Sequence, residues 1–190
     1  MNPGKTLSLA QQAIVSASQQ PSGTPRQRST APAGNAIRTG PHVVTGPGTG
    51  TLNGFHSTTL YPEGTAGTEE LGFATTYTFS WPWYDACGTV TANGSSYAYW
   101  LGSVPFDANA ISLTDHIWVS GIAISVSIPP GIAMSADGTG VVYTSTVYNN
   151  WTNTHQYSNV GFHSCVSMST PYQVDSDALA FGSASYYDNT

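Results

Sequence analysis

A run of apolar residues between positions 111 and 128 constrains the fold of this chain more than any other segment. Its members recur with a largely two-residue spacing: Ile111, Leu113, Ile117, Val119, Ile122, Ile124, Val126 and Ile128. Ala123, Ser125 and Ser127 occupy the alternate positions of its second half, and Pro129-Pro130 ends the run. Two-residue spacing is the period of a β-strand with one buried face. The pattern therefore predicts one long strand through residues 111–128.

Shorter segments of the same kind lie on both sides of this run. One of them places alternating residues on a single face: Leu71, Phe73, Thr75, Tyr77 and Phe79. The expected strands are 55–61, 71–79, 96–104, 111–128, 141–148, 161–168 and 178–187. Turn-forming residues separate them, and no segment of ten residues reads as a helix. The sequence predicts an all-β fold, an antiparallel β-sandwich of about eight strands resembling a jelly roll.

The charges are few and are divided along the chain. Charged residues make up 7% of the sequence, against roughly 25% in an ordinary soluble domain. The four basic residues are Lys5, Arg26, Arg28 and Arg38. The first acidic residue is Glu63, so residues 1–62 carry +4 and residues 63–190 carry −10. A basic tail favours a polyanionic partner, although a solvated tail that only keeps the protein soluble fits equally well.

The composition divides the chain into an arm and a body. Residues 1–54 are rich in Gln, Pro and Gly, and cannot bury enough apolar surface to order alone. We expect them to be a flexible basic N-terminal arm, and residues 55–190 to be the β-sandwich. We expect neither a signal peptide nor a transmembrane segment, because residues 7–17 are interrupted by Gln11-Gln12 and the 111–128 run alternates with Ser.

Motifs that carry chemistry are scarce. The five histidines show no metal-ligand spacing. Asp115-His116 beside abundant Ser permits a catalytic triad in principle, yet no Gly-x-Ser-x-Gly motif occurs. Asp175 and Asp177 could share a hard cation, or could lie in a solvated loop. Cys87 and Cys165 could form a disulfide, which their spacing does not decide. We therefore predict no enzymatic activity, no catalytic residues and no cofactor.

Aromatic residues are the remaining candidates for a binding role. Several lie in the body where they could fill the core, join a protein interface or stack on sugar rings. A body with no Lys or Arg cannot form salt bridges with its own copies, so its interfaces must be apolar and hydrogen-bonded. The residues that we expect to anchor such an interface are Trp81, Trp83, Tyr84 and Trp151.

This organisation resembles that of the single jelly-roll coat protein of a small icosahedral virus. The resemblance lies in the arm, with Gln19-Gln20, Pro25-Arg26-Gln27-Arg28 and Ala36-Ile37-Arg38, followed by one β domain with a long central strand. It implies a capsid subunit in a virion that self-assembles with its own copies. The arm would face the interior, where Lys5, Arg26, Arg28 and Arg38 contact genomic nucleic acid or neighbouring subunits. Protonated carboxyl groups would then favour the assembly at acidic pH.

A second interpretation keeps the sandwich and changes its role. The chain would be a secreted or surface binding module with carbohydrate as the candidate ligand, exposed aromatic residues as the sugar platform and Cys87 bridged to Cys165. Two segments match the N-glycosylation pattern and fit this extracellular alternative, Asn93-Gly94-Ser95 and Asn150-Trp151-Thr152.

Overall fold

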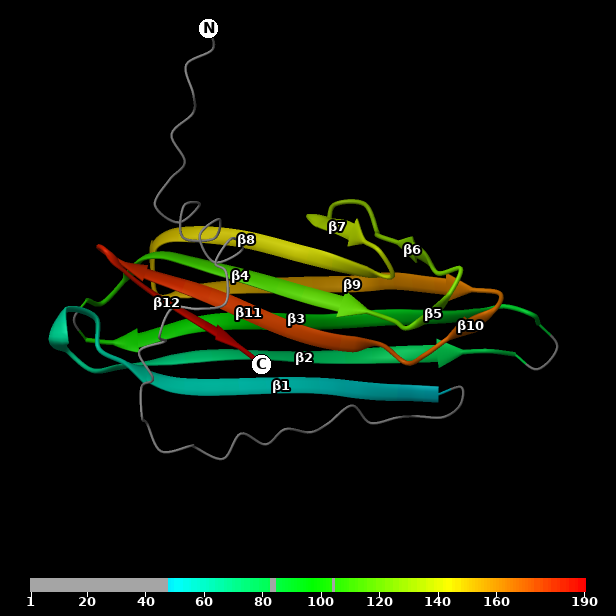
Figure 1. The fold of residues 1–190 in the computed structure, drawn as a ribbon, viewed down its shortest axis with the longest axis horizontal. Helices are drawn as coiled ribbons and strands as arrows, with labels where there is room; N and C mark the ends of the chain where they lie inside the picture. The colour runs from blue at the N-terminus through cyan, green and yellow to red at the C-terminus, as the bar shows by residue number, and fades with distance from the viewer. Residues whose placement is uncertain (1–47, 83–84, 104) are drawn as a thin grey trace, which may run out of the picture.

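The computed structural model describes residues 48–82, 85–103 and 105–190. These residues form two five-stranded antiparallel sheets packed together (Figure 1), which confirms the all-β sandwich. Sheet I has the order β1 (Gly48–Leu60), β2 (Gly67–Ser80), β3 (Gly88–Gly102), β9 (Thr152–Ser164) and β6 (Ser125–Ser127). Sheet II has the order β12 (Ala184–Asn189), β11 (Tyr172–Phe181), β4 (Ala108–Trp118), β8 (Gly140–Asn150) and β7 (Met134–Asp137). A small third ladder pairs β5 (Gly121–Ile122) with β10 (Ser167–Met168).

The connections between strands differ from those of a jelly roll, which consists of two Greek keys. Strands β1, β2 and β3 follow one another as neighbours in sheet I, and the chain crosses to sheet II only afterwards. A tight turn at η1 (Pro62–Gly64) causes the first of these pairings. Glu63 and Gly64 have positive φ angles of 53° and 79° there, which folds β2 back on β1. Strand β1 begins at Gly48, so the sandwich includes residues that the composition assigns to the arm.

The expected single strand through residues 111–128 is wrong. Strand β4 ends at Trp118, and the chain then passes through β5 to β6, which pairs with β9 in the other sheet. Ala123, at a φ of 54°, lies in this crossing. The alternation continues because Val119 before the crossing and Val126 after it pack against the same hydrophobic cluster. The periodicity therefore identifies which side chains are buried, and not whether the backbone is one strand.

Alternation along β2 agrees with the sequence. Its five predicted inward residues, Leu71, Phe73, Thr75, Tyr77 and Phe79, are all buried. Several of these aromatic rings cover a glycine on the neighbouring strand. Phe73 is the cross-strand partner of Gly54, and a Cβ at Gly54 would lie 2.3 Å from the Phe73 ring. A side chain at that glycine would displace the ring, so these pairs fix the register of the sheet.

The hydrophobic core consists of two clusters along the length of the sandwich. The first contains Tyr77, Phe79, Val90, Ala92, Ile117, Val119, Val141, Tyr157, Val160 and Phe162. The second contains Leu60, Leu71, Ala98, Trp100, Ala108, Ile111, Leu113, Leu179 and Phe181. Strand β4 contributes Leu113 to one cluster and Ile117 to the other, with the buried Asp115 between them. Polar side chains therefore separate two apolar halves of one core.

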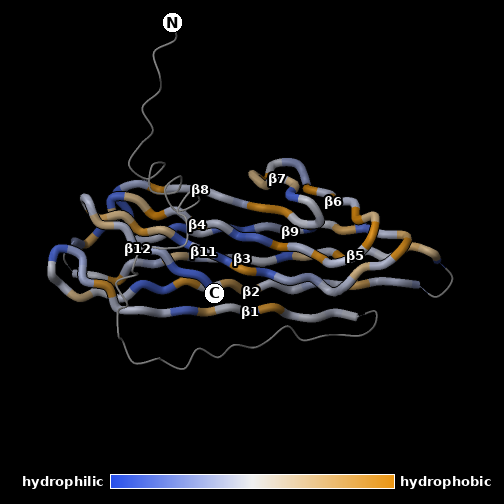
Figure 2. The backbone as a smooth tube through the Cα atoms, in the orientation of Figure 1, coloured by the Kyte–Doolittle hydropathy of each residue, from blue (hydrophilic) through white to orange (hydrophobic). Residues whose placement is uncertain are grey.

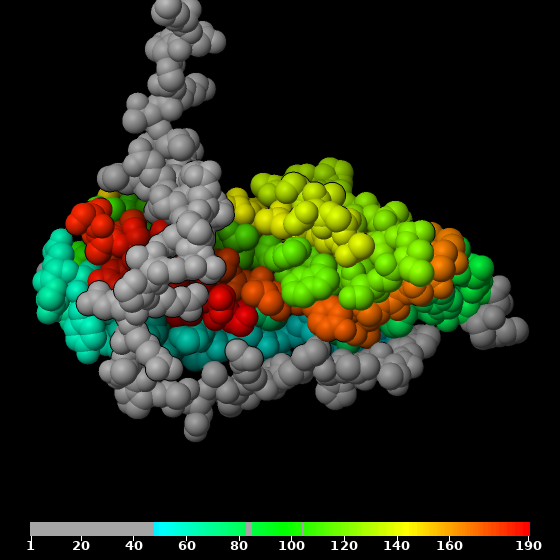
Figure 3. Space-filling model, in the orientation of Figure 1, coloured from blue at the N-terminus to red at the C-terminus, as the bar shows by residue number. Residues whose placement is uncertain are grey.

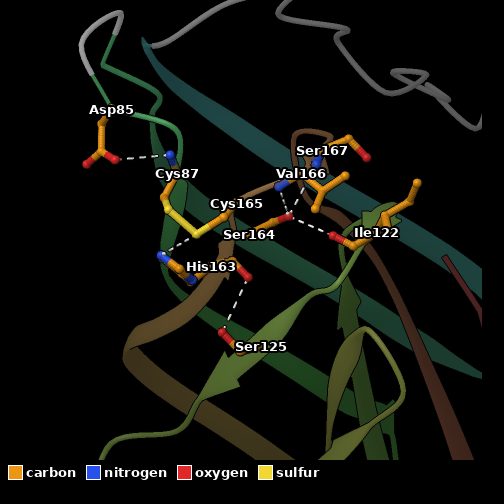
Figure 4. Close-up of a disulfide and its surroundings, with 9 residues drawn as sticks. All are labelled: Asp85, Cys87, Ile122, Ser125, His163, Ser164, Cys165, Val166 and Ser167. Atoms are coloured by element: carbon orange, nitrogen blue, oxygen red, sulfur yellow. Dashed lines mark hydrogen bonds between the residues drawn. A yellow bond between two sulfur atoms is a disulfide. The ribbon is translucent and has the colours of Figure 1, made fainter.

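A disulfide joins Cys87 to Cys165 near the end of sheet I (Figure 4). It extends the β3–β9 ladder, in which Gly88 pairs with Ser164. Ser164 Oγ donates to the Ile122 carbonyl at 2.7 Å, and this bond holds β5 against the end of β9. The segment through β5 and β6 is hydrophobic (Figure 2), and Ile122 is 63% exposed. Among the described residues, no helix is long and apolar enough to cross a membrane.

Candidate functional site

The polar residues between the two clusters form a layer across the core. The layer contains the buried residues Glu69, Thr75, Ser96, Asp115, Asn153, His155, Asp175 and Asp177. Its centre is an ion pair between the sheets, in which His155 Nδ1 of β9 lies 2.8 Å from Asp115 Oδ2 of β4. Ser96 Oγ of β3 donates to Asp115 Oδ1 at 2.7 Å. The ring of Tyr143 stacks on that of His155, with centroids 3.8 Å apart.

Ser145 completes an arrangement that has the distances of a catalytic triad. Its Oγ lies 2.7 Å from His155 Nε2, on the side of the ring opposite Asp115. Asn153 competes with His155 for the Ser145 hydroxyl proton. Its amide nitrogen donates to the carbonyls of Ile111 and Ser145, so its Oδ1 is the acceptor that faces Ser145 Oγ at 3.1 Å. Ser145 has one hydroxyl proton, so it can donate to Asn153 or to His155 but not to both, and only donation to His155 would favour nucleophilic activation.

His116 does not take part in this arrangement. Neighbouring residues of a strand point to opposite faces, so Asp115 faces the core and His116 faces outward. His116 Nε2 lies 3.9 Å from Asp137, and its ring packs against Trp118. The partner of Asp115 is instead His155, which is distant in sequence. The layer thus connects the two sheets through side chains that are distant in sequence.

Asp175 lies against Asp115 inside the layer. Burial, together with the charge of Asp115, raises the pKa of Asp175 to about 9. Gln173 Nε2 donates to Asp175 Oδ1 at 2.9 Å, while Gln173 Oε1 accepts from Tyr157 OH at 2.8 Å and from Thr75 Oγ1. Asp175 is therefore protonated at neutral pH and can donate to the Asp115 carboxylate.

A second pair of carboxyl groups lies at the β1 side of the layer. Burial raises the pKa of Glu69 to about 10 and that of Asp177 to about 7. Burial also raises the pKa of Asp188, although His56, whose Nε2 lies 2.8 Å from Asp188 Oδ2, acts in the opposite direction. Glu69 of β2 and Asp177 of β11 interact there, and the charge of Asp177 adds to burial in raising the pKa of Glu69.

Several carboxyl oxygens in the layer have no hydrogen-bond donor among the described residues. These are Glu69 Oε1, Asp175 Oδ2 and both oxygens of Asp177. Each belongs to a carboxyl group paired with another carboxyl group, and a proton retained within a pair supplies a donor for one of these oxygens. Carboxyl groups of the layer therefore remain protonated at neutral pH. The net charge of the body is less negative than the formal value of −10.

Asp175 and Asp177, the residues considered for a cation, belong to two different carboxyl pairs. Among the described residues, the group of three potential metal ligands within 4.8 Å of one another is Cys87, His163 and Cys165. Both of its sulfur atoms are in the disulfide, and His163 Nε2 lies 3.8 Å from Cys165 Sγ.

The residues predicted at interfaces have different positions. Trp81 is half-buried, packs edge-on against Phe79 and so belongs to the first cluster. Trp151 is 42% exposed at the start of β9. Trp83 and Tyr84 lie outside the described residues, as do the four basic residues of the arm, Lys5, Arg26, Arg28 and Arg38.

The outer face of sheet I carries a second candidate site. The ring of Tyr97 stacks on that of Tyr99 at 4.6 Å, and Tyr99 lies 5.8 Å from the ring of Trp151. Beside these rings is a groove of about 520 Å³ that crosses four strands. Its polar lining includes Thr51, Thr76, Asn93, Ser95, Gln156 and Ser158.

Comparison of the chain with protein-family models, with curated proteins and with solved structures finds no match. The functional argument therefore depends on the geometry of the chain itself.

Proposed function

We propose that this protein is a structural subunit that self-assembles into a coat, in which the sandwich tiles the shell and the basic arm faces the interior. The observation that carries the proposal is strand β1, the outermost strand of sheet I. It is 13 residues long, and its sequence GTGTLNGFHSTTL contains no Lys, Arg, Asp, Glu or Pro. Monomeric proteins usually protect such an edge with charges, prolines or bulges, because an edge strand is a template for pairing with another chain.

The position of β1 makes pairing between copies geometrically simple. Strands β1 and β12 are the outermost strands of their sheets and contact each other along one side of the sandwich (Figures 1 and 3). Two copies related by a two-fold axis would join their β1 strands antiparallel, as in an isologous dimer. The two sheets I would then form one continuous sheet.

Exposed apolar side chains at both ends of the sandwich supply further contact surfaces. At the end near η1, Tyr61, Leu101, Phe106 and Trp151 are 62%, 48%, 67% and 42% exposed. At the opposite end, Ile122 and Val166 are 63% and 57% exposed beside the disulfide (Figure 4). A coat subunit needs several distinct contacts, and uncharged surfaces of this kind favour protein interfaces.

The distribution of charge supports an interior position for the arm of a coat subunit. All four basic residues precede position 39 and all ten acidic residues follow position 62. The arm is therefore the part of the chain that can neutralise phosphates or pair with the acidic body of a neighbouring subunit. We propose genomic nucleic acid as its partner inside a virion, with neighbouring subunits as the alternative.

The proposal is tested by adding charge to the edge strand. Thr49→Lys with Thr59→Lys places two lysines on exposed positions of β1. The matched control is Thr78→Lys with Thr68→Lys, because Thr78 and Thr68 are the cross-strand partners of Thr49 and Thr59 on the central strand β2. Sedimentation velocity should show assemblies for the wild type and the control, and a slow monomer for the β1 variant. Equal assembly of both variants would contradict the role of β1.

A further inference from the structure

We propose that the outer face of sheet I is a binding site for an uncharged oligosaccharide. This site does not depend on self-assembly, since every residue that forms it belongs to one chain and most of them lie on sheet I. It goes beyond the structural role, because a coat subunit needs no ligand site to form a shell.

An aromatic platform occupies one part of the face. Gly72 lies at its centre on β2, with Phe55 of β1 and Tyr97 of β3 as its two cross-strand partners. A Cβ at Gly72 would lie 2.7 Å from Tyr97 OH, so the Tyr97 side chain lies directly over the glycine backbone. Phe55 is 53% exposed beside it. Tyr99, stacked on Tyr97, extends the platform toward the end of the sheet. Broad aromatic surfaces of this kind bind the apolar faces of sugar rings.

The groove continues this platform on the same face. Ser95 precedes Tyr97 by two residues on β3, and its cross-strand partner on β9 is Gln156. Two residues of a strand span roughly 6.6 Å, so the row of Ser95 and Gln156 and the row of Tyr99 are about 13 Å apart. Together the groove and platform offer room for several sugar rings. The groove volume of about 520 Å³ lies within the usual range for ligand sites.

The side chains that line the groove match the chemistry of sugar hydroxyl groups. Hydroxyls of Thr76 and Ser95 both donate and accept hydrogen bonds, and the amide of Gln156 offers two donors and one acceptor. Among residues 48–82, 85–103 and 105–190, no Lys, Arg, Asp, Glu or His lines the groove. An uncharged lining has no counter-charge for a phosphate, a carboxylate or an ammonium group, so the preferred ligand is neutral.

One carboxylate borders the platform and further favours a neutral ligand over an acidic one. Glu70 is the cross-strand partner of Tyr99 on the outer face. Burial, followed by the charge of Glu70, raises the pKa of Tyr97, so its hydroxyl stays protonated and can donate to a ligand. Negative charge at this position repels acidic sugars.

The test is a screen of neutral and acidic glycans with the full-length protein, followed by calorimetry with the tightest neutral ligand. Tyr99→Ala removes part of the platform. Gln156→Ala removes an amide that is exposed and does not pack in the core. The matched control is Tyr172→Ala on sheet II, where Tyr172 stacks on Trp118 at 5.7 Å. Each site variant should weaken binding at least tenfold, and the control should leave it unchanged.

Circular dichroism and melting temperature verify that each variant is folded, and Gln156→Ala keeps the test decisive if Tyr99→Ala does not fold. The absence of any neutral ligand, or binding that both site variants leave intact, would overturn the proposal. Preferential binding of acidic glycans would overturn it as well. Because binding is measured on whatever species the wild type forms, a failure to assemble would leave this result interpretable.

Discussion

Asp115 and His155 form an ion pair of 2.8 Å between the two sheets, and their side chains are 0% and 1% exposed. The residues are 40 positions apart in sequence and come from β4 and β9. Since residues 63–190 contain no Lys or Arg, histidine is the side chain that can balance a buried carboxylate in this body. The pair fixes one alignment of the sheets, because any other would leave a charge buried without a partner.

Asp115→Asn should destabilise the fold strongly. The change removes the counter-charge of His155 and leaves one acceptor oxygen where Ser96 Oγ and His155 Nδ1 now have two. Loss of one partner of a buried ion pair costs about 3–5 kcal/mol. Urea unfolding at neutral pH measures the change in the free energy of unfolding. Asp137→Asn is the control, since Asp137 is 66% exposed and 3.9 Å from His116. A loss no greater than that of the control would refute the structural role of the pair.

Ser145 should not react as a nucleophile. Its one hydroxyl proton has Asn153 Oδ1 as an acceptor, and when Ser145 donates there His155 Nε2 must be the donor in its own contact with Ser145 and cannot remove the proton. We expect no labelling of folded protein by a fluorophosphonate probe, as read by intact mass. Ser145→Ala should leave that result unchanged. Stoichiometric labelling that disappears in Ser145→Ala would show that the triad is catalytic.

The protein should be more stable in mild acid than in mild alkali. Burial raises the pKa of Asp177 to about 7, of Asp175 to about 9 and of Glu69 to about 10. Groups with raised pKa values stabilise the folded state fully below their unfolded values near 4, and that stability is lost as pH rises through 7 to 10. The melting temperature should therefore be higher at pH 5 than at pH 9, by about 5 °C or more.

Glu69→Gln should reduce this pH dependence. Glutamine imitates the protonated carboxyl group, so the variant should melt above the wild type at pH 9 and close to it at pH 5. The comparison is a set of calorimetric scans between these pH values. A wild-type melting temperature that rises toward pH 9 would contradict the protonation of the buried carboxyl groups.

Loss of the disulfide should lower stability without changing the fold. Cys87 and Cys165 are 78 residues apart, and a bridge across a loop of that length contributes about 4 kcal/mol in the chain-entropy account. Cys87→Ser with Cys165→Ser should reduce the free energy of unfolding in urea, while the far-ultraviolet circular dichroism stays the same. Unchanged stability would mean that the bridge does not constrain the unfolded chain.

Alternation of residues was sufficient to predict a sandwich, and it located β2 closely. It failed at residues 111–128, because Val119 just after β4 and Val126 in β6 enter the same cluster although β4 and β6 belong to different sheets. A pattern with a period of two reports burial only. Pairing depends on turns such as Glu63-Gly64, whose left-handed backbone is not apparent from residue type at Glu63.

The buried layer left a signal in the sequence that could have been used. Asp115 lies on the same face of its strand as Leu113 and Ile117, and Glu69 lies on the same face as Leu71. A charged residue at an inward position of a strand must find a partner in the core. The identity of that partner could not be inferred, because a bulge in β9 near Asn159, whose φ is 56°, lets His155 point inward and His163 outward.

The most direct test of the structural role is sedimentation velocity and negative-stain microscopy of the full-length protein over a range of pH and salt, with the ultraviolet absorbance ratio recorded. Our account predicts closed, uniform particles that persist at mildly acidic pH, and a loss of bound nucleic acid when residues 1–38 are removed. A monodisperse monomer under every condition would contradict it.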